Sequence, residues 1–425
     1  MQWIVLHDVG FGECLVLGGN RRDILMVDCG SVSPWLDTEG RWRFSDYLEK
    51  IRQQTGGAEE RTFLLTHFHK DHVCGLPMLL KADPFYFQKI YLPASPLDAR
   101  GIPLLLELSI FTDAFVPKQA MVSRLSAGML HTFGRIAALA GTEVLYTLQQ
   151  GDSFMFDGVA YDVLWPPRSP YPFPPGCVEL SMQAGRILQR HPSETVQAFL
   201  ELKDELCRAY VRCVDALAQN TQSDAAERQA CVEDIRLLIR DLNYLLPSLR
   251  SLPVADRIAG LFCGQEYSRA YSDAVNGASL IFHNRWEGAT SYEDVLFTGD
   301  ATPAAMDAVR AQLRGDYYIV KAPHHGTAAG WWEGFSSMRI SHVLISRGVG
   351  GPGGEIDPQY AQLNALCHCT SAAACGVAQL YGCCNRRLQC TETSPGGKGA
   401  GECRKESCGI FTTGPGRKIR CLCDI

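Results

Sequence analysis

The chain has 425 residues, of which 46% are hydrophobic and 20% are charged, and its formal net charge is -6. This is the composition of a globular protein, and its negative charge excludes a global attraction for nucleic acid, although a local basic groove is compatible with it. The first residues, "MQWIVLHDVG", predict a strand rather than a secretory signal. No run of about eighteen apolar residues occurs, so we expect a cytoplasmic protein without a membrane span.

The chain alternates strand and helix patterns up to about residue 360. "WIVLHDVG", "ECLVLGG", "DILMVDCGS" and "RTFLLTHFH" predict strands that end at turn residues. Helical spacing of apolar residues follows at about 103–140 and again at about 177–255. Strands resume at "ASLIFHN", "DVLFTGD", "YYIVKAPHHG" and "SHVLISRG". We therefore expect one α/β domain over 1–360 with two helical insertions.

Residues 361–425 form a cysteine-rich extension, which holds ten of the 18 cysteines. Without a secretory signal, a disulfide framework is the weaker interpretation. "CHC", "CC" and "CLC" do not have the spacing of zinc ribbons, which leaves two interpretations: a structural zinc site, or thiols buried in a tail that packs on the domain. "SCGIFTT" and "KIRCLC" predict strands that extend a sheet edge.

The segment 64–75, "LLTHFHKDHVCG", places His67, His69, Asp71 and His72 directly after an apolar run. Side chains alternate along an extended segment, so the first three point to one side, and His72 joins them where the chain turns. Imidazole and carboxylate groups are ligands of Zn²⁺. Burying these four groups without a metal would be costly. The segment therefore predicts a metal site.

Further ligands stand at the ends of two later strands. "VLFTGD" ends at Asp300, and "YYIVKAPHHG" delivers His324 and His325. A carboxylate such as Asp300 can bridge two cations, which lower the pKa of a water molecule between them. Lys70 and Lys321 border these motifs, and they are either contacts for a substrate phosphate or solvated charges.

Several motifs resemble one known superfamily. "HFHKDH" matches the HxHxDH motif of the metallo-β-lactamase superfamily. "LHDVGFGECLVL" resembles the DVGQGD segment that opens ComEC-type domains, which occur in DNA-uptake proteins and in soluble relatives. "ILMVDCGS", "NGASLIF", "VLFTGDA" and "VKAPHHGT" resemble further segments of that branch in the same order. The resemblance covers residues 1–350 apart from the helical blocks.

This resemblance implies an αββα sandwich with the site at one edge between the two sheets. It also implies two divalent metal ions, Zn²⁺ first and Mn²⁺ as the alternative, with seven candidate ligands: His67, His69, Asp71, His72, Asp300, His324 and His325. The first two would bind one ion and the next two the other. Asp300 would bridge the ions, and one of the last two histidines would complete the second site. Asp71 and Asp300 are the expected catalytic residues.

The resemblance also implies supporting residues. Asp28 is expected to orient a metal-binding histidine, and Thr327 to act similarly. Asn276 stands where many members of the superfamily have a histidine. His283, seven residues further on, is a rival for that role but is expected inside a strand.

The first functional hypothesis is a nuclease or other phosphodiester hydrolase that uses a hydroxide held by two metal ions. The ComEC-type branch includes nucleic-acid hydrolases and members of multi-protein systems such as antiphage defence, so a helical insertion is also a candidate docking surface for a protein partner.

The second hypothesis is hydrolysis of a small molecule, such as a nucleotide second messenger, a phosphorylcholine-type ester or a lactone. The third is a catalytically inactive binding module, against which the intact motifs argue. An open basic groove would favour a polymer, and a closed pocket would favour a small substrate.

Overall fold

The computed structural model describes residues 1, 3–19, 21–33, 43–117, 128–219, 221–285, 294–347 and 355–370, and the backbone of 407–411. Within these residues the strands form two seven-stranded sheets. The first has the order β14-β1-β2-β3-β4-β5-β6, with β1 (Trp3–His7), β2 (Cys14–Gly18), β3 (Ile24–Cys29), β4 (Arg61–Leu64), β5 (Lys89–Pro93), β6 (Leu145–Leu148) and β14 (Ser407–Phe411). The second has the order β13-β12-β11-β10-β9-β8-β7, with β7 (Ser153–Phe156), β8 (Val159–Trp165), β9 (Ile281–Asn284), β10 (Val295–Phe297), β11 (Asp316–Lys321), β12 (Arg339–Ile345) and β13 (Leu366–Cys369).

The two sheets pack face to face because their strands are apolar on both sides. In the first sheet, Leu15 and Leu25 point into the layer between the sheets, where they share a core with Phe297 of the second sheet. The neighbouring residues Val16 and Met26 point to the opposite face and join the core beneath the helices. This alternation follows from the two-residue period of a strand. The expected αββα sandwich is confirmed.

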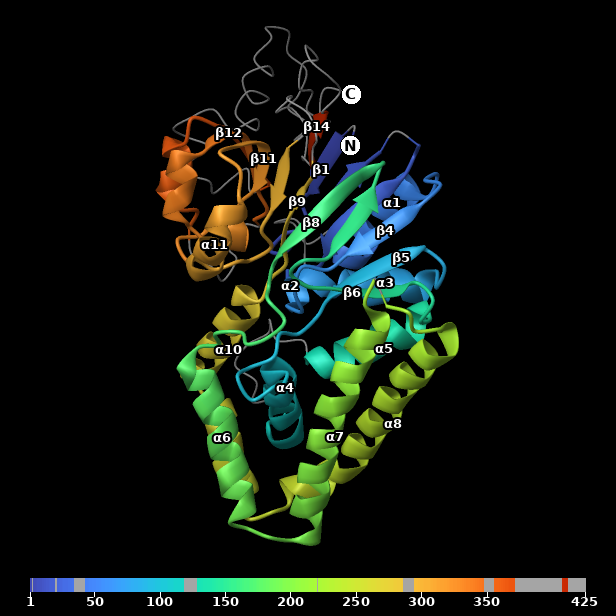
Figure 1. Cartoon of the computed structure of the whole chain (residues 1–425), viewed down its shortest axis with the longest axis vertical. Helices are drawn as coiled ribbons and strands as arrows, with labels where there is room; N and C mark the ends of the chain where they lie inside the picture. Colours follow the sequence, from blue (N-terminus) through green and yellow to red (C-terminus); the bar gives the residue numbers. More distant parts are fainter. Residues whose placement is uncertain are drawn as a thin grey trace, which may run out of the picture.

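Helices cover the outer faces of the sandwich, and a second group of helices, which includes the two longest, lies at one end of it (Figure 1). The helices on the sandwich are α1 (Phe44–Thr55), α3 (Gly75–Ala82) and α11 (Pro303–Val309), and α2 (Lys70–Val73) lies at its edge. The end group comprises α4 (Leu104–Phe115), α5 (Met129–Ala140), α6 (Pro175–Gln189), α7 (Glu194–Leu217), α8 (Ala225–Arg250), α9 (Ala255–Phe262) and α10 (Gln265–Gly277).

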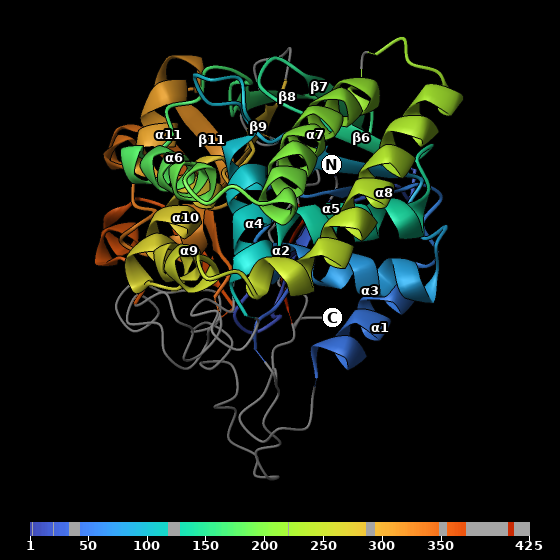
Figure 2. The same cartoon turned by 90° about the horizontal axis from the view of Figure 1, so that it is seen from below.

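Helix α4 is the centre of the end group. Its sequence "LLLELSIFTDAF" is mostly apolar, and all of its residues except Asp113 are buried, including Glu107, which pairs with Lys203 of α7. A helix of this kind must be surrounded, and Figure 2 shows it enclosed by α5 to α10, each of which it contacts. The two predicted insertions therefore pack into one helical unit.

The structure shifts two of the expected boundaries. The second helical block begins at Pro175 and continues through α9 and α10 to Gly277, beyond the predicted end at 255, so Asn276 lies on a helix. Strand β13 extends the second sheet past residue 360, and β14 pairs with β1, as "SCGIFTT" predicted. Residues 118–127 of the first block, "KIRCLC" and most of the C-terminal cysteines lie outside the described residues. None of the helices in the described ranges combines the length and the apolar character needed to cross a bilayer.

Candidate metal centre

The candidate ligands meet at one edge of the sandwich because the strands that carry them run in parallel. Strands β3 and β4 are parallel neighbours in one sheet, as are β10, β11 and β12 in the other. The carboxyl ends of parallel strands lie at the same edge. The His67–His72 segment, Asp300 and His325 follow such ends, and Asp28 is the last residue but one of β3. This edge faces the helical unit, and α2 marks it in Figure 1.

A first group of possible metal ligands consists of His67, His69 and Asp300, all buried. The His67 Nε2 atom lies 3.1 Å from His69 Nδ1 and 3.9 Å from an Asp300 carboxylate oxygen. Burial holds the pKa of His67 well below its usual range and lowers that of His69 to about 4. Both rings are therefore neutral at pH 7, the state in which an imidazole can bind a metal.

A second group consists of Glu13, His72, Asp300 and His325, and it shares Asp300 with the first. The Nε2 atoms of His72 and His325 lie 3.4 and 3.5 Å from Asp300 Oδ2. Asp71 is beside this group, with its Oδ2 atom 3.2 Å from His325 Nε2 and 3.9 Å from His72 Nε2.

Hydrogen bonds at Nδ1 fix the ring orientation of the two histidines of the second group. His72 donates through Nδ1 to the Asp28 carboxylate over 2.8 Å, and His325 donates through Nδ1 to the Ser346 carbonyl over 2.9 Å. With a metal ion bound, each ring would be neutral and would present the lone pair of Nε2 to the cluster, as the outer contacts of metal-binding histidines usually arrange. Asp28 also accepts hydrogen bonds from the Thr66 amide and hydroxyl, both at 2.7 Å.

The buried atoms of the cluster fit divalent cations. Asp71 Oδ1, Asp300 Oδ1 and His72 Nε2 are buried without a hydrogen-bond partner among the described residues, a costly state for polar atoms. Burial lowers the pKa of His72, but the carboxylates of Asp300, Asp28 and Asp71 outweigh it and raise the pKa well above its usual range. The cluster therefore attracts positive charge, which a proton provides when no metal ion is bound.

Residues with strained backbone conformations lie beside the cluster in both sheets. Asp28, His324 and His325 adopt φ values of 56°, 48° and 55°, in the left-handed region that residues other than glycine seldom occupy. Such conformations concentrate at functional sites. Gly299 has a φ of 49°, and a Cβ atom there would lie 2.9 Å from the Thr66 Cβ atom. Only glycine fits at this position, directly before Asp300.

The structure separates the two histidines that the sequence could not distinguish. His325 is buried and belongs to the second ligand group, whereas His324 lies with its Nε2 atom 3.4 Å from the Asn276 side-chain nitrogen. Asn276 thus contacts His324 rather than either ligand group. Thr327 donates its hydroxyl hydrogen to the His324 carbonyl, so it supports the turn. His283 sits in β9 against the Tyr317 hydroxyl, away from the cluster.

Sequence reasoning missed Glu13, a buried acid within the quoted "GFGECLVL" segment. Glu13 forms an ion pair with Lys321, whose ammonium group also donates to the Gly299 carbonyl over 2.8 Å. Lys321 is only 1% exposed, so its position supports neither the expected contact with a substrate phosphate nor a solvated charge. Lys70 is exposed on α2, as either interpretation of it requires. An acid at the start of an apolar strand was the signal for Glu13.

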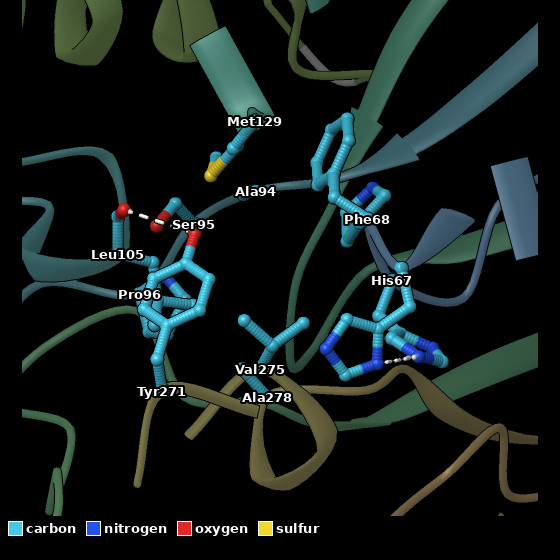
Figure 3. A pocket seen from close by; sticks show the side chains of 12 residues that line it. His67, Phe68, Ala94, Ser95, Pro96, Leu105, Met129, Tyr271, Val275 and Ala278 are labelled. Atoms are coloured by element: carbon cyan, nitrogen blue, oxygen red, sulfur yellow. Dashed lines mark hydrogen bonds between the residues drawn. The ribbon is translucent and has the colours of Figure 1, made fainter. Parts of the chain in front are cut away.

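An apolar chamber adjoins the histidines of the first group (Figure 3). His67 and His69 form one wall, and Phe68, Leu105, Met129 and Val275 are among the other lining residues. The space inside the chamber measures about 20 Å³, room for about one water molecule. Its walls come from both the sandwich and the helical unit, so the insertions help to build the site.

Comparisons with known proteins do not assign this chain to a family. No family model matches the sequence, and no curated protein matches it. Two solved structures that are similar are subclass B3 metallo-β-lactamases. MEM-A1, from a soil metagenome library, has 12% identity and a TM-score of 0.21 over 58% of this chain and 93% of its own. SMB-1, bound to 2-mercaptoethanesulfonate, has 13% identity and a TM-score of 0.20 over 58% of this chain and 97% of its own. These TM-scores are too low to carry an argument, so the fold and the site rest on the geometry above.

Proposed function

We propose that this protein is a metal-dependent hydrolase that holds two divalent cations in the cluster at the sandwich edge. One observation carries the proposal: two buried groups of metal-ligand atoms share a single carboxylate, Asp300. His67 and His69 would hold one ion, and His72 and His325 the other, with Asp71 and Glu13 as further candidate oxygen ligands. Zn²⁺ suits this mixture of imidazole and carboxylate groups.

The reaction that we propose is hydrolysis of a phosphodiester bond, in line with the sequence resemblance to ComEC-type domains. Two bound cations would supply positive charge for the phosphate oxygens and would lower the pKa of a water molecule between them. The chain itself orients the ligands, through Asp28 and the Ser346 carbonyl. Helix α10 closes the site on the helical side, where Ser272 lies 3.5 Å from His69 Nε2.

A covalent intermediate on cysteine is not part of this proposal. Cys74 is the thiol nearest to the motif in sequence, and its Sγ atom lies 3.3 Å from both the amide nitrogen and the carbonyl oxygen of Ser31. Burial raises the pKa of this thiol to about 11. A thiol with so high a pKa is almost entirely protonated at pH 7 and is a poor nucleophile. We therefore assign Cys74 to packing.

The lining of the chamber next to His67 and His69 gives no support to a nucleic-acid polymer as the substrate. None of its lining residues is lysine or arginine, whereas a site that follows a nucleic-acid backbone needs such side chains. Hydrolysis of a small phosphodiester is therefore the form of the proposal that the geometry supports best. A nuclease remains the alternative, and it requires that the polymer approach the cations from outside the chamber.

A metal-reconstitution assay tests the proposal. The protein is stripped with a chelator, reloaded with Zn²⁺ or Mn²⁺, and assayed with bis-p-nitrophenyl phosphate. We expect turnover that returns with the metal and falls by orders of magnitude in Asp300→Asn. Asp294→Asn is the matched control, because Asp294 precedes the same strand, β10, at the end away from the cluster. A protein that binds no metal, or that hydrolyses a lactone but no phosphodiester when loaded, would contradict it.

A further inference from the structure

We propose that Lys321 is a positioning residue of the metal centre: it holds one carboxylate oxygen of Asp300 away from the cations and leaves the other oxygen as the only one that bridges them. In the same proposal, Glu13 is the counter-ion of Lys321 and is not a metal ligand. This inference rests on the proposed binding of two cations at Asp300. It adds the residue that orders their ligands.

The two carboxylate oxygens of Asp300 have different neighbours. Its Oδ2 atom lies 3.4 Å from Nε2 of His72, 3.5 Å from Nε2 of His325 and 3.9 Å from Nε2 of His67. Its Oδ1 atom lies 3.6 Å from the ammonium nitrogen of Lys321. A cation is attracted to an oxygen that faces imidazole lone pairs and is repelled from one that faces an ammonium group. Oδ2 is therefore the oxygen available to both ions.

Three contacts hold the ammonium group of Lys321 between the two sheets. Lys321 is the last residue of β11 and is buried. It donates to the carbonyl oxygen of Gly299 over 2.8 Å, and Gly299 directly precedes Asp300. It also pairs with the Asp300 carboxylate and with Glu13, which belongs to the other sheet's side of the cluster. The same ammonium group thus contacts both the backbone and the side chain that deliver the shared carboxylate.

The contact with Lys321 separates Glu13 from the metal ligands. Glu13 is close enough to the second group to be a possible ligand, but its Oε2 atom forms an ion pair with Lys321. If Glu13 bound a cation instead, the buried ammonium group would lose its nearest carboxylate, and a buried charge without a partner is costly. The pair of opposite charges also adds no net charge to the cluster.

This arrangement limits the number of ligands on each ion. Catalytic metal sites keep an open position for water or substrate. Asp300 Oδ1 and the Glu13 carboxylate are two further oxygen ligands that lie beside the cluster, and Lys321 contacts both. Removing the ammonium group would release Oδ1 to bind an ion, so that Asp300 would contribute two oxygens rather than one.

The test loads the protein with Co²⁺, which binds the same kinds of ligand as Zn²⁺ and absorbs visible light more weakly as its number of ligands increases. We expect Lys321→Met to lose absorption at saturating Co²⁺, because Oδ1 then becomes a ligand. Glu13→Gln should keep the spectrum of the parent, because Glu13 is not a ligand. A parent-like spectrum in Lys321→Met, or a changed one in Glu13→Gln, would overturn the proposal.

The variant with both substitutions separates Asp300 from Glu13. It should show the same loss of absorption as Lys321→Met, since Oδ1 is free in both. A parent-like spectrum in the double variant would mean that Lys321 acts on Glu13 alone, and the role proposed at Asp300 would be wrong.

Metal affinity gives an independent result for Glu13. Glu13→Gln leaves the Lys321 charge beside the cations without its counter-ion, and we expect the Co²⁺ affinity to fall about 10- to 100-fold. Adding Lys321→Met should recover at least part of this loss, because it removes the uncompensated charge. If the affinity stays low in the double variant, Glu13 is a ligand and the proposal fails.

Lys203 offers a matched control. It is a buried lysine that pairs with the buried Glu107, and this pair lies in the helical unit. Lys203→Met should lose stability in urea but keep the Co²⁺ spectrum and affinity of the parent. A changed spectrum in this variant would show that the loss of any buried lysine disturbs the centre, which would overturn the specific role of Lys321.

A final measurement requires neither metal nor turnover. Urea unfolding of the metal-free proteins compares Asp300→Asn, Lys321→Met and the variant with both substitutions. If Lys321 holds Asp300, the equilibrium constant of unfolding in the double variant should differ about tenfold from the value that two independent effects predict. Independent effects would overturn the proposal. A parent that binds no metal, or hydrolyses no phosphodiester, contradicts the proposed function, and this comparison then decides the role of Lys321 by itself.

Discussion

Replacing Asp28 by asparagine should weaken metal binding although Asp28 is not itself in either group of possible ligands. Asparagine has the same shape, and it tolerates the left-handed backbone that Asp28 adopts with a φ of 56°. Its carbonyl oxygen can still accept the hydrogen bond from the Thr66 amide. Its NH₂ group, however, would face the Nδ1–H group of His72, where the carboxylate now accepts over 2.8 Å.

Two donors cannot share a hydrogen bond, so His72 would move its proton to Nε2, the atom that faces the cluster. A lost hydrogen bond to a charged acceptor costs about 1.5 to 3 kcal/mol. Loss of an outer partner of a metal-binding histidine typically lowers metal affinity about 10- to 100-fold, which equals about 1.4 to 2.7 kcal/mol. The two estimates agree, so we expect a Zn²⁺ affinity that is 10- to 100-fold weaker.

Competition with a chromophoric chelator measures this affinity, and the Asp294→Asn protein is again the control. Urea unfolding of the metal-free proteins shows whether Asp28→Asn is folded when it is assayed. An affinity within about twofold of the parent, in a folded Asp28→Asn protein, would show that His72 does not depend on Asp28 for its orientation. The assignment of His72 as a metal ligand would then fail as well.

Four further predictions follow from the site and its surroundings. Asp300→Ala should lower the metal content from two ions per chain, and full occupancy in elemental analysis of the variant would refute the shared carboxylate. Cys74→Ala should keep its metal and its turnover of bis-p-nitrophenyl phosphate within about twofold of the parent, because a buried, protonated thiol is not a nucleophile. Glu13→Gln should destabilise the protein by about 2 kcal/mol in urea unfolding because the buried Lys321 charge loses its nearest carboxylate and keeps Asp300 at 3.6 Å, and adding Lys321→Met should recover part of that loss. Burial lowers the pKa of His283 to about 4, so between pH 7 and pH 5 the unfolded chain takes up a proton on this residue and the folded chain does not. The free energy of unfolding should therefore decrease by about 2 kcal/mol as the pH falls from 7 to 5. In His283→Gln this decrease should be smaller by the same amount.

The sequence alone predicted an α/β fold and the ligand-bearing segments because both are encoded locally, whereas the αββα arrangement was implied by the resemblance to the metallo-β-lactamase superfamily. The period of the apolar residues predicts which segments are strands and which are helices. His67, His69, Asp71 and His72 are close together in any conformation of a six-residue segment. Asp300 was predictable for a similar reason, since it ends an apolar strand as the first cluster does.

Tertiary structure decided what depends on residues far apart in the chain. His324 and His325 are adjacent in the sequence, and the fold places His325 in a group of possible metal ligands, where its ring lies against the Ser346 carbonyl and the Asp71 carboxylate. Glu13 owes its place in the cluster to contacts with distant residues: its amide donates to the Asp71 carbonyl over 2.9 Å, and its carboxylate pairs with Lys321 of the other sheet. The apolar chamber joins a loop of the sandwich to helices α4, α5 and α10, whose own sequences show only that they have apolar faces. An apolar pattern predicts that a face is buried, but the packing of the whole chain determines which residues lie against that face and where a space remains.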